Sequence, residues 1–109
     1  MSQGKNRPDV ERSLALHREV AERLRREPRL LEEARTRVRQ WLQDGSVHQD
    51  WAQAWRGVLE GTIDEVVARL TERSEQAHDM RQVSPFAGVL DARTRWEILR
   101  RHSQLAGRA

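Results

Sequence analysis

The sequence predicts an all-α protein, a compact single domain of five to six short helices with no sheet. Apolar residues recur at three- and four-residue steps along most of the chain, as on the buried face of a helix. Helix start and stop signals separate these stretches, and no stretch of four or more residues has the alternating pattern of a strand. At 109 residues the chain has the size of one domain. We expect a flexible leader at 1–9, the helical domain at 10–106 and a flexible tail at 107–109.

Two longer helices are predicted in the first half of the chain. The first begins at Val10, with Asp9 as a candidate N-cap, and ends before Pro28, because proline disfavours helical geometry in the preceding residue. Pro28 suits the first turn of a second helix, which Asp44 and Gly45 should end. The apolar stripes of the two helices comprise Leu14, His17, Ala21, Leu24, Leu31, Ala34, Val38, Trp41 and Leu42.

Shorter helices are predicted in the second half. A third helix covers about 49–60, and Thr62 with Glu65 fits a capping box that opens a fourth. Ser74 is a candidate N-cap for a fifth stretch and Asp91 for a last helix.

The composition excludes several classes of protein. Only 37% of the residues are hydrophobic and 34% are charged, which indicates a thin core under a charged surface. The absence of cysteine excludes disulfides, thiol catalysis and cysteine-based metal sites. No apolar run reaches the length of a membrane span, and the first residues lack the apolar segment of a secretion signal. We therefore expect a cytoplasmic protein that makes no contact with a membrane.

The charges are unevenly distributed, although the net charge is only +3. Residues 1–45 and 91–109 carry an excess of basic residues, whereas 46–90 carries an excess of acidic ones. A dedicated nucleic-acid binder normally has a denser, one-sided basic excess. Five arginines are nevertheless candidates for contact with phosphate or nucleic acid, although acidic residues at helical spacing offer many of the chain's arginines ion pairs instead. The five candidate arginines are Arg35, Arg37, Arg39, Arg93 and Arg95.

No residue pattern indicates catalysis. The four histidines lack the spacing of a helical zinc motif, and His17 fits a core or capping position better than a metal-ligand position. Phosphate-binding, dinucleotide-binding and nucleophile-elbow motifs are also missing from the sequence. We expect no enzyme activity, no catalytic residue, no cofactor and no metal.

Large apolar residues provide the candidates for partner binding. We expect Trp41 and Trp96 in the core, whereas Trp51 and Trp55 are equally consistent with core packing and with partner contact. The segment 82–90 breaks the helical periodicity and is apolar, so it either packs on the helices or docks a partner. The predicted partner-binding residues are Trp51, Trp55, Arg81, Gln82, Ser84, Pro85, Phe86, Val89 and Leu90.

Two motifs resemble a known family of short bacterial proteins. The sequence Arg12-Ser-Leu-Ala-Leu-His17 and the segment 81–90, followed by Arg95-Trp96, are similar to the small partner encoded in two-gene toxin–antitoxin operons. The resemblance covers about 10–101, and Val83 stands where the pattern usually has a serine. It implies an antitoxin that binds and blocks a cognate toxin, typically a nucleotidyltransferase-like or RNA-cleaving enzyme.

The expected contact surface is the acidic region 46–90 together with Ser84–Leu90, because a toxin that handles RNA would have a basic cleft. The alternative is a helical DNA-binding regulator that uses the basic ends of the chain and recognises operator DNA. A helix–turn–helix over 38–55 would present Gln49, Gln53 and Arg56, but its second helix also carries Asp50 and two tryptophans. A non-catalytic structural subunit is a third interpretation. The sequence leaves self-association into a homo-oligomer open.

Overall fold

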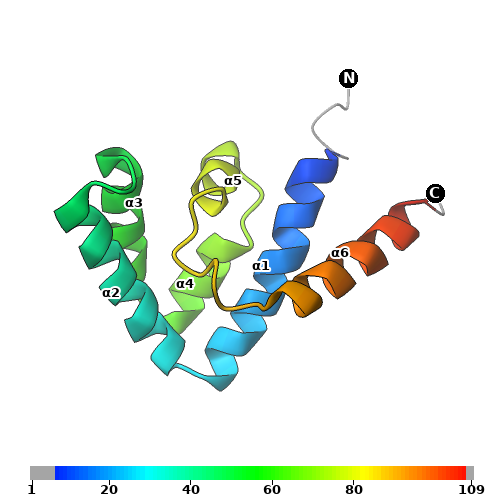
Figure 1. Ribbon diagram of the computed structural model, residues 1–109, viewed down its shortest axis with the longest axis horizontal. Helices are drawn as coiled ribbons and strands as arrows, with labels where there is room; N and C mark the ends of the chain where they lie inside the picture. Colours follow the sequence, from blue (N-terminus) through cyan, green and yellow to red (C-terminus); the bar gives the residue numbers. More distant parts are fainter. Residues whose placement is uncertain (1–6, 108–109) are drawn as a thin grey trace.

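The computed structural model describes residues 7–107, which form six helices and, within that range, no strand (Figure 1). The prediction of an all-α single domain is confirmed. The helices are α1 (Pro8–Arg26), α2 (Arg29–Asp44), α3 (Gln49–Leu59), α4 (Ile63–Leu70), α5 (Glu75–Arg81) and α6 (Ala92–Gly107).

The long helix α1 organises the fold because it contacts α2, α4, α5 and α6. Leu14 and Leu24 are fully buried on its inner face. Pro8 occupies the first turn, where its missing N–H removes no helical hydrogen bond. The helix α6 packs along α1, and its far end projects away from the other helices (Figure 1).

The helices α2 and α3 form an antiparallel pair joined by residues 45–48 (Figure 1). Gly45 ends α2 in the left-handed conformation, with φ of 70°, and its N–H donates to the carbonyl of Trp41. Glycine adopts this conformation without the steric penalty of a side chain. The predicted stop at Asp44 and Gly45 is therefore confirmed.

Side-chain caps define the starts of the later helices. Thr62 and Glu65 form the predicted capping box, with N–H to side-chain oxygen distances of 2.8 and 3.2 Å. Ser74 caps α5 by accepting from the N–H of Ala77 at 3.1 Å. Asp91 accepts from the N–H of Thr94 at 2.8 Å and caps α6. The sequence identified all three caps correctly.

The core lies where α1 to α5 and the segment 82–90 meet. Trp55 of α3 and Phe86 of the segment are each 1% exposed and pack edge to face, with ring centroids 6.3 Å apart. The indole Nε1 of Trp55 donates to the carbonyl of Met80 at 3.1 Å. A buried indole needs such an acceptor, so this bond joins α3 to the end of α5.

The segment 82–90 is pinned to the helices. Ser84, Pro85 and Phe86 are buried, and the hydroxyl of Ser84 accepts from the N–H of Phe86 at 3.1 Å. From outside, Arg37 donates to the carbonyl of Pro85 at 2.6 Å. Of the two predicted roles for this segment, packing on the helices is the one that the contacts support.

Three expectations differ from the structure. Pro8 and Asp9 belong to α1 and not to a leader, and Asp9 lies in the first turn because Arg7 is the N-cap residue. Gly107, placed in the tail by the sequence, is the last residue of α6, while residues 1–6 and 108–109 lie outside the described range. Trp96, expected in the core, is 61% exposed, because it lies on a face of α6 that no other described helix covers.

Candidate functional site

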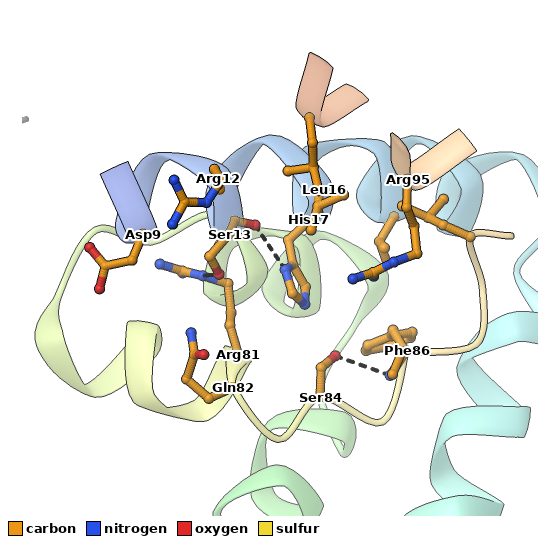
Figure 2. Close-up of a pocket in the computed structure, with 14 residues that line it drawn as sticks. Asp9, Arg12, Ser13, Leu16, His17, Arg81, Gln82, Ser84, Phe86 and Arg95 are labelled. Carbon is orange, nitrogen blue, oxygen red and sulfur yellow. Dashed lines mark hydrogen bonds between the residues drawn. The ribbon is translucent and has the colours of Figure 1, made fainter. Parts of the chain in front are cut away.

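A pocket of about 400 Å³ opens between α1, the residues 81–90 and the first half of α6 (Figure 2). This volume lies within the range of small-molecule sites, roughly 300–1,000 Å³. Its polar lining comes from three elements: α1 supplies Asp9, Arg12, Ser13 and His17, the end of α5 and the following segment supply Arg81, Gln82 and Ser84, and α6 supplies Arg95.

The side of the pocket formed by α1 follows from helical spacing. Asp9, Ser13 and His17 are one turn apart and therefore share one face of the helix. The ring of His17 extends from this face into the pocket, toward the side on which Ser84 and Phe86 lie (Figure 2). Buried polar groups need partners: the hydroxyl of Ser13 has one across the pocket, in Arg81, whereas the ring of His17 has one within α1, the carbonyl of Ser13.

Arg81, the last residue of α5, is a buried arginine with an exposed fraction of only 4%. Its Nε donates to the hydroxyl of Ser13 at 2.8 Å and its Nη1 to the carbonyl of Glu72 at 2.6 Å. Its Nη2 is buried without a hydrogen-bond partner among the residues that the structure describes. Burial lowers the pKa of Arg81 from its ordinary value, because the charged guanidinium loses contact with water.

His17 is also buried, and its Nδ1 lies 2.9 Å from the carbonyl oxygen of Ser13. Burial lowers the pKa of His17 to about 4, and the positive charges of Arg81 and Arg95 add to the effect. The imidazole is therefore neutral near pH 7. Its Nδ1–H donates to Ser13, which leaves Nε2 as a hydrogen-bond acceptor.

The pocket carries more positive than negative charge. Within the described range 7–107, the side chains of Arg12 and Arg95 make no hydrogen bond or ion pair, although the backbone N–H of Arg95 donates to the carbonyl of Asp91. Asp9 is the one carboxylate in the lining and already has two partners: it lies 3.3 Å from Arg7 and 3.4 Å from the Nε2 of His78. Figure 2 shows the guanidinium of Arg95 directed toward His17.

The structure separates the predicted partner-binding residues into two groups. Arg81, Gln82, Ser84, Phe86 and Leu90 line the pocket, and among them only Gln82 is well exposed.

The remaining members are core residues or pack against the core. Trp55 and Pro85 are buried, whereas Trp51 and Val89 are partly buried against the core. For Trp55, which the sequence left open between core and contact, the structure supports the core. Direct partner contact by Trp55, Pro85 or Phe86 would require them to leave the interior.

Most of the arginines predicted to contact phosphate have partners within the protein. Arg35 donates to the carbonyl of Leu59 at 2.7 Å, and Arg37 donates to that of Pro85, so both join separate segments of the fold. Arg39 bonds to Thr36 on its own helix, and Arg93 lies 3.5 Å from Glu97. Arg95 differs, because it lines the pocket.

Part of the acidic excess of 46–90 is balanced by arginines. Asp64 is paired with Arg25 at 2.7 Å, Glu75 with Arg7 at 2.5 Å, and Glu72 with Arg69 at 3.3 Å. These pairs reduce the negative field that the sequence suggested for docking on a basic cleft. In the same region, α3 runs back alongside α2, whereas a helix–turn–helix sets its helices at a steep angle (Figure 1).

Sequence reasoning did not assemble this pocket. It predicts Arg81, Gln82 and Ser84 as partner-binding residues and Arg95 as a phosphate contact, and it gives Arg12 and Ser13 no place in a site. The available signal was the alignment of polar residues at 9, 13 and 17 along one edge of the apolar stripe of the first helix.

Within the described range, no group of three or more histidine or acidic side chains could hold a metal ion. No helix in the same range combines the length and the apolar character that crossing a membrane requires. Comparison with protein-family models, curated proteins and solved structures gave no match.

Proposed function

We propose that this protein is a binding protein of the antitoxin type, which neutralises a cognate toxin enzyme by protein–protein contact. The observation that carries the proposal is Trp96, the one large apolar side chain exposed within the described range, at 61%. Tryptophan and arginine are the residues that contribute most to protein–protein hot spots. The two motifs that resemble the antitoxin family support the same function.

The proposed contact surface is the outer face of α6, defined by Arg93, Trp96, Arg100 and Arg101. The guanidinium of Arg100 lies over the indole of Trp96, 4.9 Å from the ring centroid, so the face combines an aromatic centre with positive charge. All four residues are exposed. Such a face fits a partner with an apolar groove bordered by acidic residues.

The test is toxin neutralisation by variants of the full chain. The product of the adjacent gene is expressed alone, with the natural protein, and with Trp96→Ala or Arg26→Ala. Arg26, the exposed last residue of α1, provides the control. We expect growth to be rescued by the natural protein and by Arg26→Ala, and lost with Trp96→Ala. Equal rescue by Trp96→Ala, with equal co-purification, would contradict the contact surface. An adjacent product that is neither toxic nor bound would contradict the function.

A second candidate function, autoregulation by DNA binding, is favoured by the charge of α6. Its described side chains, 92–103, include four arginines and one acidic residue, Glu97. Arginines on one helix can contact the phosphates of a duplex and give salt-dependent binding. A mobility-shift assay with the upstream DNA of the gene, over a salt series, tests this function. Specific binding at physiological salt supports it, and binding that is equal for unrelated DNA contradicts it.

A further inference from the structure

We propose that the pocket between α1, residues 81–90 and α6 is a binding site for the phosphate group of a small organic phosphomonoester. This inference does not depend on the proposed toxin, because it rests on the lining of the pocket alone. Four features carry it: the charge balance, a buried arginine with an unused donor, the direction of the polar groups and an apolar wall.

The charge balance suits a dianion. The lining contains the guanidinium groups of Arg12, Arg81 and Arg95 and one carboxylate, that of Asp9, while His17 is neutral. This lining has an excess of two positive charges. A phosphomonoester above its second pKa, which is near 6, has a charge of the same magnitude and opposite sign. A carboxylate ligand would leave one positive charge without compensation. The pocket therefore favours phosphate over carboxylate.

Arg81 supplies the strongest single indication of a ligand. Most buried polar atoms in proteins have a hydrogen-bond partner, and a buried charge without a counter-ion is costly. Ser13 and two backbone carbonyls occupy Nε and Nη1 of Arg81, but no described residue accepts from Nη2. The carboxylate of Glu72 acts on this guanidinium, and an anion in the pocket would add a second negative charge that offsets the cost of its burial.

The polar groups surround the pocket and do not lie along one wall. Arg12 and Ser13 come from α1, Gln82 and Ser84 from the segment after α5, and Arg95 from α6, on a third side (Figure 2). A planar carboxylate is satisfied by one guanidinium fork. Donors on three sides suit a tetrahedral group, whose oxygen atoms point in different directions.

An apolar wall extends the site beyond the phosphate. Leu16, Val20, Phe86 and Leu99 line the same pocket, and none of them can bond to an oxyanion. Their surfaces would contact the organic part of a ligand and exclude water from it. For this reason we infer a phosphomonoester with an apolar or aromatic portion, and not inorganic phosphate.

The probes of the test are inorganic phosphate, adenosine 5′-monophosphate, phenyl phosphate and acetate, each added to the full-length protein at constant ionic strength. Binding is followed by calorimetry and by the NMR signals of the His17 ring. We expect both phosphomonoesters to bind at least tenfold more tightly than inorganic phosphate, and acetate to bind more weakly than phosphate. The bound dianion should also raise the pKa of His17, because it offsets the nearby arginines.

Two variants on α6 provide a matched comparison. Arg95→Gln removes a charge from the pocket, whereas Arg93→Gln removes the same charge two residues away, from a side chain that is 87% exposed and outside the pocket. We expect Arg95→Gln to weaken phosphomonoester binding roughly tenfold or more, and Arg93→Gln to leave it within about twofold. Both residues are on the surface of one helix, so both variants should fold.

The proposal is overturned if neither phosphomonoester binds at millimolar concentration, or if the two variants weaken binding equally, which would indicate general attraction to a basic helix. Equal binding of acetate and phosphomonoester would overturn the choice of phosphate. Toxin neutralisation is measured separately with Arg95→Gln, so failure of the pocket and failure of the proposed function give distinct results.

Discussion

The guanidinium Nε of Arg81 donates to the hydroxyl of Ser13 at 2.8 Å, across 68 positions in sequence, and thereby joins the end of α5 to the middle of α1. The same arginine bonds to the carbonyls of Leu70 and Glu72, at the end of α4 and in the loop after it. One buried side chain thus holds three segments at the edge of the pocket.

Replacement of Arg81 should destabilise the domain. Arg81→Ala removes three hydrogen bonds and leaves the hydroxyl of Ser13 and a buried carbonyl without partners, so we expect a loss of about 2–4 kcal/mol in the free energy of unfolding. Urea unfolding followed by circular dichroism measures this loss. Arg39→Ala, which removes one exposed bond to Thr36, is the control and should change stability by no more than about 0.5 kcal/mol. Equal stability of the two variants would refute the role of Arg81.

The exposed and buried tryptophans should respond differently to truncation. Trp55→Ala removes a fully buried ring and its bond to Met80, and should cost about 3–5 kcal/mol. Trp96→Ala should change stability by less than about 0.5 kcal/mol, because its ring is largely in water. Thermal unfolding of both variants tests the difference. A large loss of stability for Trp96→Ala would show that the ring of Trp96 is packed against the rest of the protein and is not exposed.

His17 should make stability depend on pH. Its pKa is about 4 in the folded protein and near 6.5 in the unfolded chain, so the unfolded chain binds more protons between these values. The contribution of His17 to stability should therefore be nearly constant above pH 6.5 and fall by about 3 kcal/mol as the pH drops to 4.

The matched variant for this prediction is His17→Gln, compared with the natural protein in buffers without phosphate. Groups other than His17 titrate in both proteins, so the difference between the two stability curves isolates the histidine. Parallel curves between pH 4 and 6.5 would mean that His17 titrates normally in the folded state.

Gly45 gives a prediction about the backbone. Its φ of 70° is unfavourable for residues with a side chain, although a Cβ there would meet no atom within 4 Å. Gly45→Ala should therefore cost about 1–2 kcal/mol from backbone strain alone, and Gly45→Asn should cost less, because asparagine tolerates this conformation better. Chemical denaturation of both variants gives the comparison, and equal stabilities for them would argue against this explanation.

Local signals predicted the fold well. The stops at Gly45 and Pro28, the capping box at Thr62 and the caps at Ser74 and Asp91 each depend on a few adjacent residues, so they can be read without tertiary information. These signals predict five to six helices, and the described residues form six.

Burial could not be read in the same way. Trp55 and Trp96 both lie in amphipathic stretches, yet one is 1% and the other 61% exposed, because exposure depends on which helix packs on that face. The pocket could not be predicted from the sequence either, because Arg12, Arg81 and Arg95 come together only through the packing of α5 and α6 on α1.

The most direct test of the proposed binding function uses the indole N–H signals of the four tryptophans in an NMR titration with the product of the adjacent gene. The signal of Trp96 should shift or broaden at the lowest partner ratio, while those of Trp41, Trp51 and Trp55 keep their positions. If Trp96 is unaffected and Trp51 or Trp41 responds first, the partner binds the α2–α3 side of the molecule, and the assignment of the contact surface to α6 is wrong.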